Sequence, residues 1–330
     1  MSHPIDVVIA WVDGNDPVLS EKRGRYTGNG SKSTLASGEH STRFASVNEI
    51  RYCVLSIMRF APFVRNIFVI TDGQDPALYD DIRRYFPERL DSFRIVDHQE
   101  IFEGFEAFLP TFNSISIGNM IWRIKGLSEN FVYFNDDTFL IREIQPEDWF
   151  INDKPLLRGR WIPAPLPRLG WNRVRMAVNR YLLRNPGYQP RASFHLGQWN
   201  SASLLGFRLR YFTNSHTPHT VERGPIEEFF GSRKPLLRKN IAFRFRHPSQ
   251  FTFISLSNHL QLQHGNRQIA DPGLAYLQPY NRAGDYIDKK IRFCENNRDI
   301  KFLCVQSLDL CSKADQDKIL GWMEGLLSKL

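Results

Sequence analysis

Four short apolar runs, each followed at once by an acidic turn, constrain the fold of this chain more than any other feature. The runs are residues 5 to 12, 66 to 71, 93 to 96 and 131 to 134. Apolar runs of this length without alternating polar residues predict strands buried on both faces, as in a parallel sheet. Since parallel strands end at one edge of a sheet, the acids that follow them are expected to converge there. These acids are Asp13, Asp72, Asp97, Asp136 and Asp137.

Helical periodicity fills the intervals between these runs. Apolar residues recur at helical spacing over residues 46 to 60, and residues 76 to 86 and 113 to 124 also predict helices. Strands that alternate with helices predict an α/β fold with a mostly parallel, Rossmann-like sheet and flanking helices. Residues 315 to 329 predict a closing amphipathic helix, and residues 20 to 42, rich in Gly, Ser and Thr, predict a loop.

The charge balance favours an anionic partner. Lysine and arginine number 43 against 35 aspartates and glutamates, a formal net charge of +8. Such a balance suits phosphates, nucleic acid, anionic glycans or membrane headgroups without choosing between them. The sequence contains no helix-turn-helix, zinc-finger or RNP pattern, so no nucleic-acid partner is expected. The four cysteines show no C-x-x-C spacing, which does not support zinc and suits a reducing cytosol.

No segment predicts a leader or a membrane span. The N-terminus MSHPIDVVIAWVDG lacks a basic region followed by a long apolar run, so no signal peptide is expected. No stretch approaches the roughly 20 apolar residues that a transmembrane helix needs. The chain is therefore expected in the cytoplasm, and any membrane contact is expected to be peripheral.

The segment FVYFNDD (131–137) carries the strongest chemical signal, because two adjacent carboxylates, Asp136 and Asp137, leave the end of a buried strand. Buried carboxylates are costly without a cation or hydrogen-bond donors. A hard divalent ion, Mg²⁺ or Mn²⁺, would bridge them to phosphate oxygens of a substrate and neutralise a departing nucleotide. On these residues alone, the alternative is that both side chains cap a helix or hold a loop.

Several segments, in order along the chain, resemble the conserved regions of Stealth proteins. IDVVIAWVDGNDP (5–17) looks like the first region, and the span from Arg43 to Leu140 is similar to the second and longest. HTPHTVERGPIEEFF and FRHPSQFTFISLSNHLQLQHG resemble the third region, and KFLCVQSLDL (301–310) resembles the fourth. Together these segments cover more than half of the chain.

The resemblance implies both a fold and a reaction. The family includes bacterial capsule and exopolysaccharide phosphotransferases and the animal lysosomal-enzyme GlcNAc-1-phosphotransferase. It implies a GT-A-like α/β sheet with a helical C-terminal part, and transfer of a hexose- or HexNAc-1-phosphate from a UDP-sugar to a glycan hydroxyl. The hydroxyl would attack the sugar-linked phosphorus, form a phosphodiester and release UMP. The implied acceptor is a glycan or a lipid-linked oligosaccharide.

The same resemblance implies roles for individual residues. Asp136 and Asp137 match the acidic pair of the family and are expected to bind the metal, with Asp137 also in catalysis. His219 matches the proposed general base, a role suited to a side chain that titrates near neutrality. Arg246 matches a basic residue that would hold phosphoryl oxygens. Substrate-binding roles are expected for Trp11, Asp13, Gly14, Asn48, Glu49, Arg51, Asp72, Asn113 and Arg123.

Alternatives remain for these residues, and the sequence departs from the family in two places. His219 could be a surface or capping histidine, and Arg51 and Arg246 could be ordinary salt-bridge partners. In the fourth region an Asn-Asp pair usually follows the cysteine, whereas here VQS follows Cys304 and the acid arrives only at Asp309. The extra domains with which the animal enzyme recognises proteins are also missing, which favours a polysaccharide acceptor.

Three segments are expected within one catalytic unit. Residues 1–155 would form the α/β core that binds the nucleotide-sugar. Residues 156–215 would form a basic helical insertion for acceptor or membrane contact, and residues 216–330 a C-terminal part that completes the active site.

The insertion contains a basic amphipathic segment. Residues 168 to 184 predict a helix with Trp171, Val174, Val178 and Tyr181 on one side and arginines on another. Such helices lie on anionic bilayers, which would place the chain at the inner face of the cell membrane, near lipid-linked acceptors. The alternative is a packed helix with a solvated basic face.

Two other functions stay open at this stage. An ordinary glycosyltransferase of similar α/β design would release UDP rather than UMP, so the released nucleotide separates the two reactions. A non-enzymatic binder of polyanions would use the positive charge alone and would bind with a steep dependence on salt.

Overall fold

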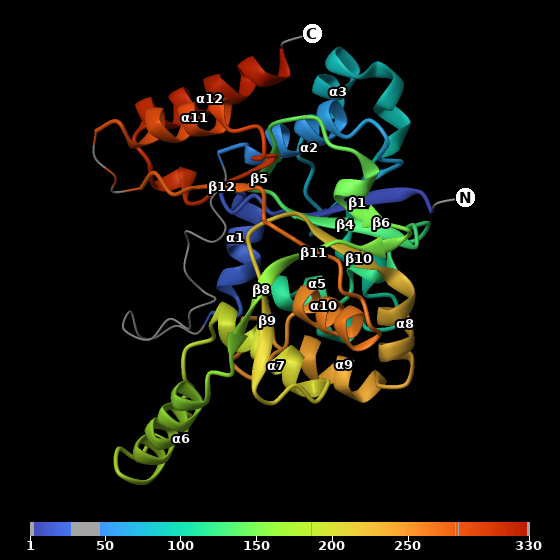
Figure 1. The fold of residues 1–330 in the computed structure, drawn as a ribbon. Coiled ribbons are helices and arrows are strands. Elements are labelled where there is room, and N and C mark those ends of the chain that lie inside the picture. The colour runs from blue at the N-terminus through green and yellow to red at the C-terminus, as the bar shows by residue number, and fades with distance from the viewer. Residues whose placement is uncertain (1–2, 28–46, 186, 281, 283, 329–330) are drawn as a thin grey trace.

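The computed structural model describes residues 3–27, 47–185, 187–280, 282 and 284–328 (Figure 1). Most of the loop expected at residues 20 to 42 lies outside the described residues. The same is true of residues 43–46, which begin the segment similar to the second Stealth region.

The core of the fold is a five-stranded sheet with the order β10-β4-β1-β2-β3. Its neighbouring strands are parallel, except that β10 runs antiparallel to β4 at the edge. The four predicted strands and the mostly parallel α/β sheet are therefore confirmed. The strands are β1 (Ile5–Ala10), β2 (Ile67–Thr71), β3 (Phe93–Asp97), β4 (Asn130–Asn135) and β10 (His219–Glu222).

The strand order places a topological switch point between β1 and β4. The chain passes from β1 through β2 to β3 on one side, and then forms β4 on the other side of β1. Ligands of open α/β sheets bind outside the carboxyl ends of the strands at such a point. β1 ends at Ala10, opposite Asn135 of β4, so the segments after these two residues lie side by side. This edge of the sheet is on the left of Figure 1.

Smaller sheets and most of the helices surround the central sheet (Figure 1). β13 pairs with β5 and β12, while β8 pairs with β9 and β11. These strands, with the hairpin β6-β7, are β5 (Thr138–Leu140), β6 (Phe150–Ile151), β7 (Lys154–Pro155), β8 (Leu157–Pro163), β9 (Arg210–Asn214), β11 (Ile269–Ala270), β12 (Leu274–Leu277) and β13 (Phe302–Val305). The α-helices are α1 (Pro17–Gly24), α2 (Glu49–Phe60), α3 (Tyr79–Tyr85), α4 (His98–Ile101), α5 (Ser114–Gly118), α6 (Leu166–Tyr181), α7 (Phe194–Leu204), α8 (Arg223–Gly231), α9 (Lys234–Ile241), α10 (Phe253–Gln263), α11 (Tyr286–Asn296) and α12 (Lys313–Leu327).

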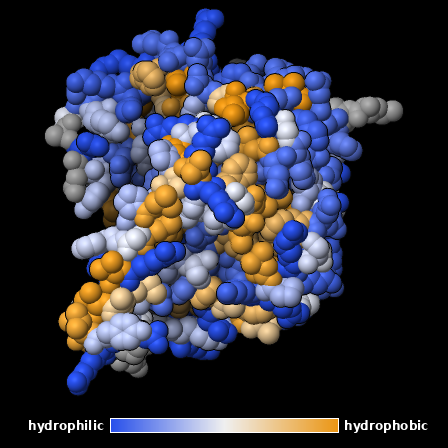
Figure 2. Space-filling model, turned by 60° about the horizontal axis from the view of Figure 1, so that its bottom comes forward, coloured by the Kyte–Doolittle hydropathy of each residue, from blue (hydrophilic) through white to orange (hydrophobic). Residues whose placement is uncertain are grey.

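Two of the helices expected in the C-terminal half are confirmed, as α6 and α12. α6 projects from the body of the molecule at the lower left of Figure 1, and none of its described residues is buried. Figure 2, in which the bottom of the molecule comes forward, shows hydrophobic and hydrophilic residues alternating over this corner. No helix in the described ranges is both long enough and apolar enough to cross a bilayer.

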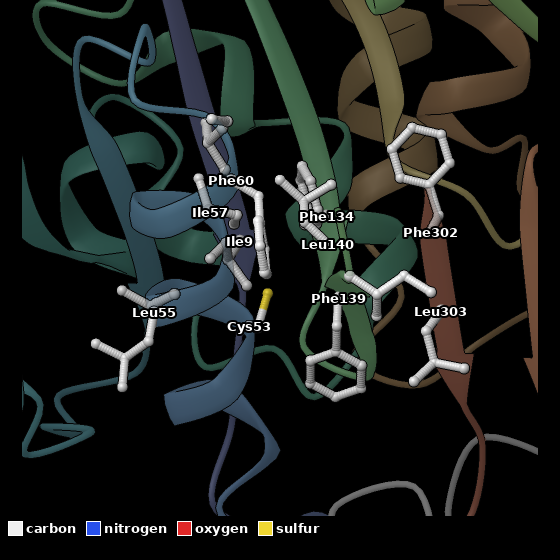
Figure 3. Packing of buried hydrophobic residues seen from close by; sticks show 14 of the residues in the cluster. Ile9, Cys53, Leu55, Ile57, Phe60, Phe134, Phe139, Leu140, Phe302 and Leu303 are labelled. Carbon is white, nitrogen blue, oxygen red and sulfur yellow. The ribbon is translucent and has the colours of Figure 1, made fainter. Parts of the chain in front are cut away.

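Two hydrophobic cores cover the two faces of the central sheet. Val7 and Ile9 of β1 belong to the first core and Val8 to the second, because successive side chains of a strand point to opposite faces. α2, β5 and β13 close the first core. Figure 3 shows Cys53 of α2 turned toward β4, the strand that carries Phe134. α8, α9 and α10 close the second core. Burial of each large aliphatic side chain contributes about 1.5–3 kcal/mol to the stability of the fold. The two cores therefore stabilise the sheet whose edge carries the acids.

The helix predicted over residues 113 to 124 is wrong in its length. The structure forms only α5 and a 3-10 turn at Ile121–Arg123. The helix ends at Asn119, whose backbone N–H and side-chain amide both donate to the Ile115 carbonyl, at 3.2 and 2.8 Å. Such a local bond from an asparagine side chain to the backbone is typical of a helix end rather than of a helix interior. Gly118, directly before it, lowers the helix propensity at the same place.

Candidate active site

Trp11 and the acidic pair meet at the switch point. Since Ala10 pairs with Asn135 across the β1-β4 ladder, Trp11 and Asp136 are the next residues on the two strands. Trp11 is buried, and its indole Nε1 has no hydrogen-bond partner in the described part of the chain. A buried donor without a partner at a strand end is a group that a ligand can satisfy.

The acidic pair lies in an environment that disfavours its negative charge. Burial raises the pKa of Asp136 well above its ordinary value, and the charges of Asp137 and Glu49 raise it further. Burial also raises the pKa of Asp137 to about 6. Glu49, the first residue of α2, is itself buried and acts electrostatically on both. Three carboxylates thus share a region that is only partly open to solvent.

Neighbouring groups hold Asp137 in place. The hydroxyl of Thr138 donates to Oδ1 at 3.3 Å, and the thiol of Cys304 donates to Oδ2 at 3.7 Å. The backbone N–H of Val305 donates to the Asp137 carbonyl at 2.9 Å. The segment resembling the fourth Stealth region therefore lies against the acidic pair through Cys304. Asp309 forms no hydrogen bond or ion pair with the pair in the part of the chain described.

The donor set fits a magnesium-type ion that a substrate helps to bind. Within the described ranges, no group of three or more His, Cys, Asp or Glu side chains is arranged to hold a metal by itself. Mg²⁺ commonly binds through one or two carboxylates, with water and substrate phosphates completing its shell. Asp136 and Asp137 supply such hard oxygen ligands, and a cation would relieve the repulsion that raises their pKa values.

His219 comes to the same edge from the C-terminal part of the chain. It begins β10 and lies directly opposite Tyr133 of β4. Burial lowers the pKa of His219 to about 3, and the charges of His216 and Arg158 add to this effect. The amide Nδ2 of Asn214 is 3.5 Å from Nε2 of His219. At neutral pH the imidazole is therefore neutral, and its lowered pKa makes it a weaker proton acceptor than the near-neutral histidine expected from the sequence.

The positive charge of Arg246 reaches the part of β4 that carries Tyr133. The pKa of Tyr133 is raised by burial and then by the charge of Asp136, while the charge of Arg246 opposes this rise. Nη2 of Arg246 also donates to the hydroxyl of Ser114 at 2.6 Å. Tyr133 lies directly opposite His219, and its pKa is affected by the charges of both the acidic pair and the Arg246 guanidinium.

Asn113 supports the segment that carries Arg246. Its amide Nδ2 donates to the Phe243 carbonyl and to Oε1 of Gln250, both at 2.9 Å. Its Oδ1 accepts the N–H of Ile115 and so caps α5. With these atoms engaged, Asn113 can fix the backbone on both sides of Arg246.

Asp13, Gly14 and Asp72 lie at the ends of β1 and β2, where protein groups already engage the two acids. Oδ1 of Asp13 accepts the N–H of Asn15 at 2.9 Å. Asp72 forms a salt bridge of 2.7 Å with Lys22 of α1. These contacts order the edge of the sheet beside the acidic pair.

Three other expected binding residues have structural contacts. Arg51 pairs with Asp81 and Glu324, and thereby joins α2 to α3 and α12. Arg123 donates to the backbone carbonyls of the last residue of α4 and of Glu103, and lies over a phenylalanine ring. Asn48 precedes α2 with a left-handed backbone (φ 67°), and so sets the direction from which Glu49 enters.

Arg158 is a feature that the sequence analysis did not single out. It lies on β8, is buried, and donates from Nη2 to the Asp148 carbonyl at 2.6 Å. Its Nε and Nη1 have no partner among the described residues, and its charge reaches His219. Burial lowers the pKa of Arg158 to about 10. An arginine in the apolar run LLRGRWI (156–162) is the signal that would have marked it.

The parallel sheet and its switch point define an α/β protein of the Rossmann-like class. Residues 3–31 match the family model described as Stealth protein CR1, conserved region 1, and residues 43–156 match Stealth protein CR2, conserved region 2.

Whole-chain relatives agree with these matches. Capsular polysaccharide phosphotransferase WcwK of Streptococcus pneumoniae is 30% identical over 96% of this chain and 93% of its own length. Receptor polysaccharide phosphotransferase WefC of Streptococcus gordonii is 30% identical over 86% of this chain and 85% of its own length. The chain belongs to the Stealth family, which confirms the resemblance seen in its sequence.

Some relatives are much longer. Exopolysaccharide phosphotransferase SCO6023 of Streptomyces coelicolor is 32% identical over 92% of this chain, and the chain spans 47% of that protein's length. Among solved structures, the galactosyltransferase LgtC with donor and acceptor sugar analogues aligns with 98% of this chain and 96% of its own, at 12% identity and a TM-score of 0.40. Similarity at that level carries no argument about chemistry.

Proposed function

We propose that this chain transfers a hexose- or HexNAc-1-phosphate from a UDP-sugar to a glycan hydroxyl, in the biosynthesis of a capsular or cell-surface polysaccharide. The observation that carries the proposal is the meeting of the acidic pair after β4 with a neutral, buried His219 directly across the β4-β10 ladder. An acidic pair that can bind a divalent cation, beside a proton acceptor, suits attack of a hydroxyl on the phosphorus of a diphosphate. The polysaccharide phosphotransferase names of the relatives support the same reaction.

In the proposed reaction the oxygen of the acceptor hydroxyl forms a bond to the sugar-linked phosphorus, while His219 accepts the proton of that hydroxyl. The bond from that phosphorus to the bridging oxygen of the diphosphate breaks, and UMP leaves with the electron pair. Arg246 holds phosphoryl oxygens with its guanidinium. Asp136 and Asp137 would hold Mg²⁺ or Mn²⁺, and this ion would neutralise negative charge on the leaving nucleotide.

Two buried side chains suit the donor substrate, because each has donor nitrogens without a hydrogen-bond partner in the described part of the chain. Trp11 Nε1 lies at the end of β1, beside the acidic pair, and Nε and Nη1 belong to Arg158, whose charge reaches His219. Buried polar groups without partners are costly unless a ligand pairs with them. We therefore place donor contacts at Trp11 and Arg158 in addition to Asp13, Gly14 and Glu49.

We propose that the reaction takes place on the cytoplasmic side of the membrane, with a lipid-linked oligosaccharide as an acceptor class. All four cysteines are free, which suits a reducing compartment. The exposed basic helix α6 would provide peripheral contact with the inner face of the membrane.

Identification of the released nucleotide tests the proposal. Purified protein is incubated with Mg²⁺, a panel of UDP-sugars and short glycan acceptors, beside Asp137→Asn and His219→Ala. Asp91→Asn and His264→Ala serve as matched controls, since both side chains are exposed and distant from the switch point in sequence.

We expect UMP and a phosphodiester product with the wild type and both controls, and a loss of at least about 100-fold in the two site variants. Release of UDP would instead assign ordinary glycosyl transfer and remove the role given to His219. Full activity of Asp137→Asn would exclude the acidic pair as the metal site.

A further inference from the structure

The positive charge of the chain is concentrated in one segment. Residues 156–215 contain ten arginines and no aspartate, glutamate or lysine. The whole chain has 43 basic and 35 acidic residues. Without these ten arginines, the remainder of the chain holds 33 basic and 35 acidic residues. The net charge of the protein therefore belongs entirely to the segment that contains α6.

α6 presents an apolar stripe to solvent. Trp171, Val174, Val178 and Tyr181 follow one another at spacings of three, four and three residues, which places them on one face of the helix. Their exposed fractions are 63%, 53%, 37% and 73%. The stripe continues into exposed leucines directly after the helix, at Leu182–Leu183.

Arginines flank the stripe on both sides. At 100° per residue, Arg168 and Arg175 fall beside one border of the stripe and Arg173 and Arg180 lie beyond the other. None of these four forms a salt bridge with a residue that the structure describes. A helix with an apolar stripe, arginines at its flanks and no acid has the composition of helices that lie in the headgroup region of a bilayer.

The body of the protein holds only the beginning of the helix. Leu169 packs against a small cluster that includes Trp199 and Tyr211, while the rest of α6 extends away from the body (Figure 1). Figure 2 shows hydrophobic residues lying open to solvent along this projecting corner. α6 also projects on the side of the molecule toward which the carboxyl ends of the central strands point.

We propose that α6 is a membrane-docking helix that inserts its apolar stripe into an anionic bilayer. The charge distribution favours a lipid surface because arginines without acids match anionic headgroups, and the aromatic residues Trp171 and Tyr181 suit the interface between headgroups and acyl chains. A soluble polyanion would engage the arginines but would leave the apolar stripe in water. The purpose of docking, delivery of the site to lipid-linked acceptors, rests on the proposed function, whereas vesicle binding does not.

Vesicle flotation of the full chain tests this inference. Vesicles of phosphatidylcholine alone are compared with vesicles containing phosphatidylglycerol, at low and high salt. One variant combines Trp171→Ala with Tyr181→Ala, and a second combines Arg173→Gln with Arg180→Gln. Phe293→Ala and the pair Arg292→Gln with Arg298→Gln are the matched controls, since these side chains are also exposed but lie on or beside α11.

We expect the wild type to bind vesicles with phosphatidylglycerol and not those without it. Loss of two arginines should weaken binding roughly 30-fold, given the contribution of each charge near an anionic surface, and loss of the two aromatic residues should weaken it without changing the net charge. The controls should bind like the wild type. Because these side chains are exposed, thermal unfolding should remain unchanged in every variant.

Three results would overturn the inference. One is vesicle binding that both α6 variants retain. A second is binding of inorganic polyphosphate without binding of anionic vesicles, which would assign the surface to a polyanion. A third is a dimer that dissociates in the Trp171→Ala, Tyr181→Ala variant while vesicles stay unbound. Asp137→Asn should float like the wild type, so failure of the proposed chemistry would leave this result unaffected.

Discussion

The thiol of Cys304 lies 3.7 Å from Oδ2 of Asp137, and thereby joins β13 to the acidic turn after β4. This contact places a buried, weakly polar group on one side of the acidic pair, where water would otherwise solvate the carboxylates. The hydrogen bond from Cys304 lowers the pKa of Asp137, whereas burial raises the pKa values of both Asp136 and Asp137 and outweighs it. Negative charge on the acidic pair is therefore costly despite this contact.

Removal of one carboxylate should stabilise the protein in the absence of metal. Asp136→Asn removes a buried charge that Asp137 and Glu49 repel, so we expect its unfolding free energy in EDTA to rise by about 1–2 kcal/mol. Addition of Mg²⁺ should raise the melting temperature of the wild type and leave that of the variant almost unchanged. Asp91→Asn is the control. A variant less stable than the wild type in EDTA would show that Asp136 has a favourable protein partner.

Arg158 should be more important for turnover than for folding. A buried guanidinium whose Nε and Nη1 have no hydrogen-bond partner among the described residues can be replaced by an apolar side chain at little cost or with a gain in stability. We expect Arg158→Met to change the unfolding free energy by less than about 1 kcal/mol and to lower kcat/KM at least ~10-fold. Arg160→Met, at an exposed position on the same strand, should change neither. Unaltered kinetics with reduced stability would make Arg158 a structural residue.

Arg51 should behave in the opposite way. Its guanidinium connects α2 to Asp81 and Glu324, at 2.9 and 2.7 Å. We expect Arg51→Ala to lower the unfolding free energy by roughly 1–3 kcal/mol, because both partners are partly exposed and solvent screens them. Urea denaturation measures this change, with Arg83→Ala, which breaks an exposed pair, as control. A raised KM for the donor with unchanged stability would instead support the substrate-binding role expected from the sequence.

Stability should fall with acidification partly through His259. Its Nε2 accepts the Phe212 N–H at 3.0 Å, its Nδ1 donates to the Ser255 carbonyl, and burial lowers its pKa from 6.5 to about 4. Below pH 6.5 His259 binds a proton in the unfolded chain, whereas in the folded chain it stays neutral until about pH 4. The free energy of unfolding therefore decreases as the pH falls from 6.5 to about 4.

His259→Gln isolates this effect. The slope of unfolding free energy against pH between 6.5 and 4 should decrease by up to about 1.4 kcal/mol per pH unit relative to the wild type. Urea unfolding at several pH values measures the slope. His98 and His219, which burial also holds neutral, remain in both proteins and cancel in the comparison. Parallel slopes would show that His259 accepts a proton in the folded state.

The apolar runs predicted the four parallel strands because a strand buried on both faces leaves a clear local signal. β10 has only four residues and pairs with β4 across a long stretch of sequence, so no local pattern revealed it. The acidic pair was predicted from its position at a strand end. The contacts that engage Arg51 and Asn113 depend on tertiary packing, and residue spacing contains no information about them.

The edge strand β10 and the contact of β13 with Asp137 also bear on synthesis of the protein. A chain leaving the ribosome presents the acidic turn first, then His219, and Cys304 last. Domains generally fold from the N-terminal side as they emerge, yet here the parallel strands can assemble before β10 and β13 have been synthesised. A product that stops before Cys304 therefore lacks the cover over the acidic pair, and one that stops before His219 also lacks the edge strand of the sheet.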